Sequence, residues 1–335
     1  MTTPKPAPSP APKPAGEPRP KAVTFGGSTT GATYTVMGAA MARMVQKYTG
    51  VTAGSEPLGG GAANLYAMHK KEIEFSSIVT TDAYDAPRGL GEYKETGPIS
   101  ISSLFAQHHF LMTGIVRAAS DIKTVEDWRG KRLMAKNPKT ALPFRFAEAI
   151  LSAYGMTPND VIVQPIPGSK DRIVAITEKT TDVLFSPYTE ATSYLIELFQ
   201  RVPSRFIPLD NDKMDIMIKN DPVWYKAVMP ARSYKGQDIM VPLIGINILA
   251  VCRSDLSEDF VYEVMKAIWD HFDDELKPMH PNFKYFEKGS LLHRATAPFH
   301  PGAIRYWKEV GLWDDEAQKL QDELLKELKA LGAKY

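Results

Sequence analysis

The feature that most constrains the fold is a recurring order of strand, small-residue turn and helix. Three consecutive strand-like segments, 22–25, 51–57 and 75–79, end in glycine or small polar residues, and helical periodicity follows the first two. The same order returns after 133–135 and 181–185. In an open α/β sheet, ligands bind beyond the carboxyl ends of the strands. The sequence therefore predicts two similar α/β lobes with polar strand ends.

The first of these strand ends, FGGSTTGATY at 25–34, predicts an anion-binding loop. Free backbone N–H groups at a helix N-terminus favour negative charge, and Ser28, Thr29, Thr30 and Tyr34 add hydroxyl groups. The loop lacks the Lys-Ser/Thr of a Walker loop and the G-x-G-x-x-G order, which argues against nucleotide and dinucleotide sites. An ordinary tight turn between strand and helix stays open as an alternative.

Further candidate ligand residues stand at the other strand ends. Lys136 and Lys139 flank a strand-to-helix turn where side-chain charge would add to the N–H groups, although each could equally be an ordinary surface residue. The remaining candidates are Gly59, Gly60, Gly61, Thr80, Asp82, Thr140, Arg145, Ser186 and Tyr188.

Composition excludes several classes of function. The 335 residues carry a net charge of +1, which argues against a nucleic-acid partner. With one cysteine, Cys252, the chain can form no internal disulfide and no cysteine-based metal site. His108 and His109 would point to opposite faces of a strand, so we expect no metal there. We expect no cofactor, and, since no catalytic motif is present, no enzyme.

The two ends of the chain differ from the part between them. Residues 1–21 are rich in Pro, Ala and Lys, which predicts a disordered tail or linker, and they lack the apolar core of a signal peptide. Residues 315–331 predict a charged amphipathic helix with Leu320, Leu324, Leu328 and Leu331 on one face. We also expect a strand at 244–253 to pair antiparallel with 110–117.

Six segments, in order, resemble the solute-binding receptors of TRAP transporters of the TAXI type. The loop at 26–34 looks like their glycine-rich strand end, and LGGGAANL at 58–65 is similar to their T-G-G-S-x-x-N-L segment. VEDWRGKR at 125–132 and AYGMTPND at 153–160 match two further turns. The stretch 249–280 and FHPGA at 299–303 complete a resemblance that covers about 22–313.

This resemblance implies a type II periplasmic-binding-protein fold, two α/β lobes with a ligand cleft at the hinge. Lobe 1 would hold 22–108 plus 255–313, lobe 2 would hold 109–254, and 314–335 would form the C-terminal helix. The two crossings would lie near 106–110 and 252–256. It implies a periplasmic or extracytoplasmic receptor, with no export signal in this sequence, that captures a small anionic solute (glutamate, glutamine, a 2-oxoacid or a related carboxylate). A TRAP-type membrane permease would receive the solute, and we expect a monomer.

The chain departs from that family at the expected cleft. Thr33 replaces the first of two tyrosines, KNPKT at 136–140 replaces G-P-x-G-S-G-T, and FSPYT at 185–189 replaces a glycine-bearing strand end. The solute could therefore differ, although the added lysines favour an anion. Two alternatives remain: a ligand-sensing or scaffolding module that uses the cleft or helix 315–331, and an enzyme on the same scaffold.

Overall fold

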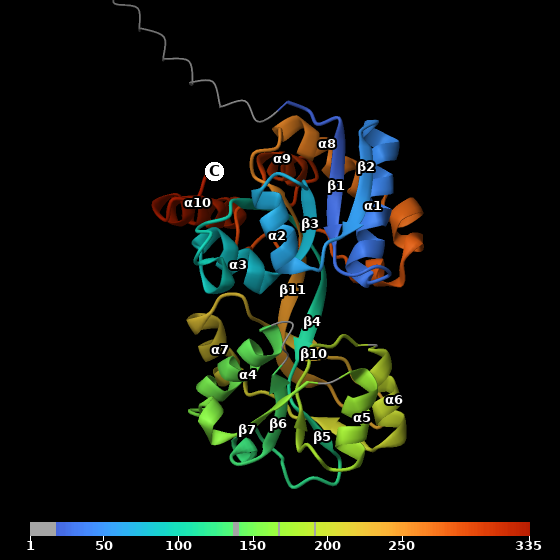
Figure 1. Ribbon diagram of the computed structural model, residues 1–335, viewed down its shortest axis with the longest axis vertical. Helices are drawn as coiled ribbons and strands as arrows, with labels where there is room; N and C mark the ends of the chain where they lie inside the picture. Colours follow the sequence, from blue (N-terminus) through green and yellow to red (C-terminus); the bar gives the residue numbers. More distant parts are fainter. Residues whose placement is uncertain (1–17, 137–140, 167, 191) are drawn as a thin grey trace, which may run out of the picture.

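The protein folds into two α/β lobes joined by a pair of long strands (Figure 1). The structure is a computed structural model, and it describes residues 18–136, 141–166, 168–190 and 192–335. Lobe 1 contains both the first strand and the C-terminal helix, so the chain leaves this lobe once and returns to it. Within the described ranges, no helix is long and apolar enough to cross a membrane.

Lobe 1 is built on parallel strands with helices on both faces. The sheet has the order β2-β1-β3-β11-β4, and β10 pairs with the far half of β11. Figure 1 shows α2 and α3 on one side of this sheet and α1 on the other. The elements are β1 (Ala22–Gly27), α1 (Thr33–Thr49), β2 (Thr52–Pro57), α2 (Gly61–His69), β3 (Phe75–Val79) and α3 (Thr80–Arg88).

Lobe 2 repeats the arrangement with shorter strands. Its sheet has the order β7-β6-β8-β5-β9, and α4 and α7 lie on the side opposite α5 and α6 (Figure 1). The elements are β5 (Ile115–Arg117), β6 (Arg132–Lys136), α4 (Leu142–Ala153), β7 (Ile162–Pro165), α5 (Ser169–Thr177), β8 (Val183–Leu184), α6 (Ser193–Arg201), β9 (Ser204–Phe206), α7 (Asn211–Asn220) and β10 (Tyr225–Met229).

The hinge is an antiparallel pair of long strands, β4 (Ile101–Met112) and β11 (Val241–Arg253). Their register runs from Ile244 opposite Met112 to Arg253 opposite Ile101. The expected pairing of 244–253 is confirmed for 110–112. It is wrong for 115–117, because β5 pairs with β8 and β9 instead. Since Ile248–Cys252 pair with β3 of lobe 1, we propose that β11 crosses between the lobes before Ile248 and not at 252–256.

The carboxyl ends of the parallel strands in the two lobes face each other. β11 runs from lobe 2 into lobe 1, and β3 is antiparallel to it, so β1, β2 and β3 all run toward lobe 2. In lobe 2, Ile115 pairs with Leu184 and Leu111 pairs with Tyr188, both antiparallel. β8 therefore runs back toward lobe 1, and β6, β7 and β9 run with it.

The C-terminal part of the chain returns to lobe 1 and packs there. It contains α8 (Glu258–Trp269), α9 (Pro301–Glu309) and α10 (Asp315–Ala330). On α10, Leu324 and Leu328 are buried as expected, but Leu331 is 50% exposed and Ala317 and Gln321 are buried in its place. Short helical turns complete the fold: η1 (Gly91–Tyr93), η2 (Glu126–Trp128), η3 (Pro158–Asp160), η4 (Phe272–Leu276), η5 (Lys277–Met279) and η6 (Pro281–Tyr285).

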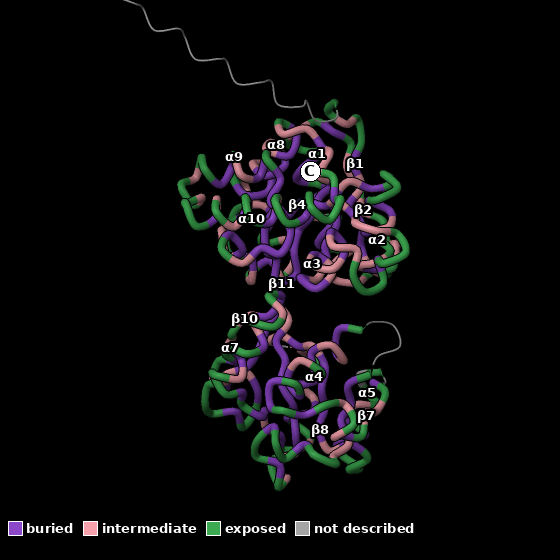
Figure 2. Tube along the Cα trace, turned by 90° about the vertical axis from the view of Figure 1, so that its left-hand side faces the viewer, coloured by how far each residue is buried: buried purple, intermediate pink, exposed green. Residues whose placement is uncertain are grey.

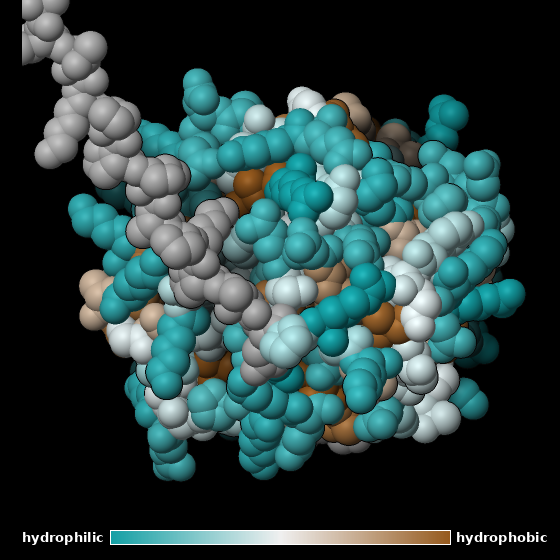
Figure 3. All heavy atoms as spheres, turned by 90° about the horizontal axis from the view of Figure 1, so that it is seen from above, coloured by the Kyte–Doolittle hydropathy of each residue, from teal (hydrophilic) through white to brown (hydrophobic). Residues whose placement is uncertain are grey.

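Each lobe has its own hydrophobic core. One cluster of buried side chains fills lobe 1, and two clusters fill lobe 2, on either face of its sheet. Figure 2 shows these buried strands inside each lobe, with exposed residues on the outer helices. The end of the molecule seen in Figure 3 is mostly hydrophilic, with small separate hydrophobic spots. Two separate cores let the lobes move as units about the hinge.

Candidate functional site

The loops at the ends of β1 and β2 meet at the edge of lobe 1 that faces lobe 2. The Gly59 N–H donates to the carbonyl of Ser28 at 2.9 Å, which joins the two loops. Gly59 and Gly60 both have φ near 109°, a conformation that residues with a Cβ rarely adopt. Thr29 and Thr30 are exposed. The structure thus brings together the predicted residues of the first two strand ends.

Seven helix N-termini also face the space between the lobes. Helices α1 to α7 each follow a strand whose carboxyl end points at the opposite lobe. In the part of the chain that the structure describes, six of the seven, α1 to α3 and α5 to α7, have no side-chain hydrogen bond from the N-cap residue. In contrast, α8, α9 and α10 do not follow such strands, and they are capped by Ser257, His300 and Asp314. The uncapped N–H groups are therefore concentrated between the lobes.

Asp82 places a carboxylate among these N-termini. It lies in the first turn of α3, and its carboxylate occupies the space that a Cβ would need at Gly61, the first residue of α2. Burial raises the pKa of the Asp82 carboxyl to about 7, and the charges of Glu92 and Asp85 add to this effect. Burial, and then Asp82, raise the pKa of the Tyr34 hydroxyl well above its ordinary value. The surface of lobe 1 that faces lobe 2, here called the lobe 1 wall, therefore has a carboxyl group, Asp82, that titrates near neutrality.

The surface of lobe 2 that faces lobe 1, here called the lobe 2 wall, lies only partly within the residues that the structure describes. Lys136 is exposed at the end of β6, while Lys139 and Thr140 lie outside the described residues. Ser186 is buried at the end of β8, and its Oγ accepts a hydrogen bond from Arg172 at 2.9 Å. These positions agree with a cationic wall, but for Lys136 and Ser186 a ligand role stays a prediction.

Three predicted residues are held in contacts within the protein. Tyr188 is 1% exposed in the core of lobe 2, and its hydroxyl accepts from the Thr113 N–H at 2.9 Å. Thr80 is also buried, and its Oγ1 donates to the carbonyl of Asn247 at 2.9 Å and accepts from the Asn247 N–H at 3.1 Å. The structure therefore brings neither side chain to the surface between the lobes.

Arg145, the third, connects the lobes. From α4 of lobe 2, its guanidinium contacts Asp85 of α3 in lobe 1 at 2.6 Å and Asp221 in lobe 2 at 2.8 Å. Because Arg145 and Asp85 belong to different lobes, their contact is an ion pair between the lobes.

The sequence reasoning missed a polar cavity of about 210 Å³ on the hinge. It lies between β4 and β11 of the hinge, the segment 285–294 of lobe 1, and β10 with Glu190 of lobe 2. His109 Nε2 lies 2.7 Å from Glu190 Oε1. The guanidinium carbon of Arg294 lies 4.4 Å from the centre of the Tyr225 ring. The adjacent pair HH at 108–109 is the signal in the sequence, and by itself it indicates only that the two rings point to opposite faces of a strand.

His108 and His109 have different neighbours, as expected for adjacent residues of a strand. The His108 ring lies 5.9 Å from that of Tyr34, and the His109 ring 5.8 Å from that of Tyr285. Burial lowers the pKa of His108 to about 3, with a smaller effect of His109, so His108 is neutral at physiological pH. No group of three or more His, Cys, Asp or Glu in the described ranges is arranged to hold a metal ion.

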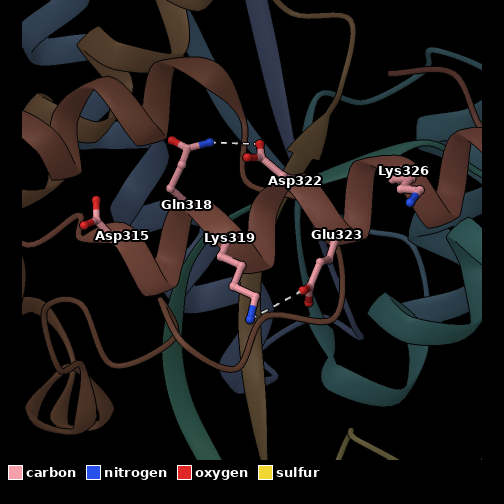
Figure 4. Close-up of a pocket in the computed structure, with 6 residues that line it drawn as sticks. All are labelled: Asp315, Gln318, Lys319, Asp322, Glu323 and Lys326. Carbon is pink, nitrogen blue, oxygen red and sulfur yellow. Dashed lines mark hydrogen bonds and ion pairs between the residues drawn. The ribbon is translucent and has the colours of Figure 1, made fainter.

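The outer face of α10 is a weak candidate for a binding site. Figure 4 shows its charged side chains side by side along one helix. Gln318 donates to Asp322 at 3.0 Å, and Lys319 lies 4.0 Å from Glu323, so these groups pair with each other. The opposite face of α10 is covered by lobe 1 through Ala317, Gln321, Leu324 and Leu328. The helix is therefore a packed part of lobe 1.

The comparisons with known proteins agree with this architecture. The model of the NMT1-like family matches residues 25–311. Among solved structures, XAC2383 from Xanthomonas citri bound to chloride ion is 11% identical with a TM-score of 0.54, over 90% of this chain and 99% of that chain. The periplasmic sulfonate-binding protein SsuA from Methylobacillus flagellatus KT, a putative sulfonate ABC transporter component, is 14% identical with a TM-score of 0.50, over 92% and 95%.

These structures share the two-lobed fold described above, so the expected type II periplasmic-binding-protein fold is confirmed. At this identity the likeness concerns the fold alone. The family match, in contrast, covers most of the chain, and the protein therefore belongs to the NMT1-like family.

Proposed function

We propose that the protein is a solute-binding receptor that captures a small anionic solute, such as a carboxylate, an amino acid or a 2-oxoacid, between its lobes. The observation that carries the proposal is the distribution of helix caps. Among the described residues, six helices that begin at the interlobe space, α1 to α3 and α5 to α7, have no side-chain cap, whereas α8, α9 and α10 are capped. Because N–H groups at helix N-termini need an acceptor, an anion between the lobes would satisfy several at once.

Capture would proceed by closure of the lobes around the solute. The solute contacts both walls only when the lobes are close, so binding shifts the population toward the closed state. The strand-end loops of lobe 1, with Ser28, Thr29 and Thr30, would form one wall, and Lys136 would contribute charge from the other. The lobes would rotate by bending of the long strands β4 and β11, and the hydrophobic core of each lobe would stay intact. No chemical step is required of the protein in this mechanism.

Calorimetric titration with glutamate, glutamine, 2-oxoglutarate and an alkanesulfonate tests the proposal. We expect saturable binding of at least one of these anions, weakened about tenfold in Lys136→Glu through the introduced repulsion. Lys308→Glu is the matched control, since Lys308 is exposed on α9, away from the strand ends. Absence of heat with every anion would reject an anionic solute.

The resemblance to TAXI-type receptors supports a finer proposal, in which the closed receptor acts outside the cytoplasm, as a monomer, and delivers its solute to a TRAP-type permease. Uptake of the solute by vesicles that contain a candidate TRAP permease, with and without the receptor, measures this directly. Stimulation by the receptor is expected. Stimulation of an ABC-type permease instead would leave the receptor function intact and overturn the choice of partner.

A further inference from the structure

The hinge cavity contains buried polar atoms that lack partners within the protein. Among the described residues that line the cavity, four buried atoms have no hydrogen-bond partner: Oε1 of Gln107, Nδ1 of His108, Oε2 of Glu190 and Nε of Arg294. Gln107 is only 1% exposed, and its Nε2 is directed to Met41 Sδ at 3.9 Å. A buried polar group without a partner costs about 1–3 kcal/mol. The unpaired atoms of this cavity therefore favour a polar occupant.

The unpaired atoms also define the charge of that occupant. Burial alone would raise the pKa of Glu190, but the hydrogen bond and charge of His109 outweigh this effect and lower it, so the carboxylate is ionised. Glu190 and Gln107 offer acceptors, and Arg294 offers a donor with a positive charge. A ligand that complements them carries a donor-rich cation at one end and an anion at the other.

Size limits the ligand to a small molecule. A cavity of about 210 Å³ has the volume of roughly seven water molecules at liquid density. Glycine, alanine and serine fit within this volume and carry an ammonium group and a carboxylate close together. A dicarboxylate would place a second negative charge beside Glu190 and Glu287, which also lines the cavity.

We infer that the hinge cavity is a second binding site, for a small α-amino acid, with the ammonium group on Glu190 and Gln107 and the carboxylate on Arg294. This goes beyond the proposed function, which concerns the strand ends. Arg294 lies in the segment whose neighbours Leu291 and Leu292 belong to the core of lobe 1, whereas Glu190 and Tyr225 belong to lobe 2. An occupant would thus join both lobes at the hinge and stabilise the lobe angle seen here.

The chemistry can be tested on the unmodified protein with three probes. L-alanine carries both charged groups, propionate lacks the ammonium group, and ethylamine lacks the carboxylate. In calorimetric titrations, L-alanine should bind at least tenfold more tightly than either analogue. Equal affinity for L-alanine and one analogue, or no saturable binding of L-alanine, glycine and L-serine, would overturn the inference. This test does not depend on any variant being stable.

The location is tested with Glu190→Gln, which preserves size and removes the negative charge, and with Arg294→Gln, which removes the positive charge and shortens the side chain. Each should weaken L-alanine binding at least tenfold, whereas Glu323→Gln on the outer face of α10 should leave it unchanged. Lys136→Glu distinguishes the two proposals. It should weaken binding of the anionic solute, whereas the affinity for L-alanine should stay within twofold of the wild-type value. If L-alanine affinity fell in Lys136→Glu but not in Glu190→Gln or Arg294→Gln, the amino acid would bind at the strand ends. That result would refute the hinge site.

Discussion

Substitution of Asp82 by Asn should remove a pH-dependent loss of stability. The ordinary pKa of the carboxyl is 3.8, and in the folded protein burial, with Glu92 and Asp85, raises it to about 7. The folded state therefore holds this proton more tightly than the unfolded chain. The resulting stability is fully present below the unfolded pKa and is lost as the pH rises through the folded pKa. At about 1.4 kcal/mol per pKa unit, the total is on the order of 4 kcal/mol.

The measurement is urea unfolding of the wild type and Asp82→Asn at about pH 5 and about pH 8. Between these values the wild type should lose ~3 kcal/mol more than the variant, because part of the total is already lost by pH 5. Asp121→Asn is the matched control, since the Asp121 side chain is 84% exposed. Parallel pH profiles for wild type and Asp82→Asn would show that the Asp82 carboxyl is not held protonated, and would refute this account of the lobe 1 wall.

Three other predictions follow from individual contacts. Arg145→Met leaves two partly buried carboxylates unpaired, so it should lower the free energy of unfolding by about 1–3 kcal/mol and widen the lobe angle measured by X-ray scattering; an unchanged scattering profile would argue against a cross-lobe role. Tyr188→Phe should lose about 1 kcal/mol in urea unfolding through the Thr113 hydrogen bond, with solute affinity unchanged by calorimetry. His108, with its pKa lowered to about 3, should show constant ring chemical shifts in NMR spectra from about pH 5 to pH 8; a titration in that range would contradict its burial as a neutral group.

Local patterns in the sequence predicted most of the helices and strands because each element has a strong periodicity and clear turn residues. The strand at 75–79 is placed as expected, and the helices expected after 133–135 and 181–185 are α4 and α6. The segment expected at 110–117 is divided in the structure, since 115–117 form β5 and 110–112 are the end of the long strand β4. Its polar run QHH at 107–109 reads as a break in an isolated strand. In the structure these residues line the hinge cavity, and polar groups of both lobes surround them.

The candidate site was predictable where a strand end defines it and unpredictable where distant contacts decide. Glycines and hydroxyl residues at 26–30 and 59–61 mark their loops by type alone. Arg145 has the right charge and the right position in the chain, yet its carboxylate partners come from 60 and 76 residues away. Glu190 and Arg294 gave no local signal, because they meet only when the lobe 1 segment that follows η6 folds back beside the hinge.

The distribution of capped and uncapped helices also shows where the protein lacks the stabilisation that a side-chain cap gives to a helix. Capping a helix N-terminus with a side chain stabilises it by about 1 kcal/mol, and the chain obtains this at Ser257, His300 and Asp314. Among the described residues, six helices that face the other lobe, α1 to α3 and α5 to α7, lack this stabilisation. Asp82 lies at the N-termini of α2 and α3, and with its pKa raised to about 7 it can bind a proton near neutral pH. An anionic solute that enters between the lobes would therefore complete contacts that the protein leaves open, and the affinity for the solute and the closure of the lobes would have the same physical origin.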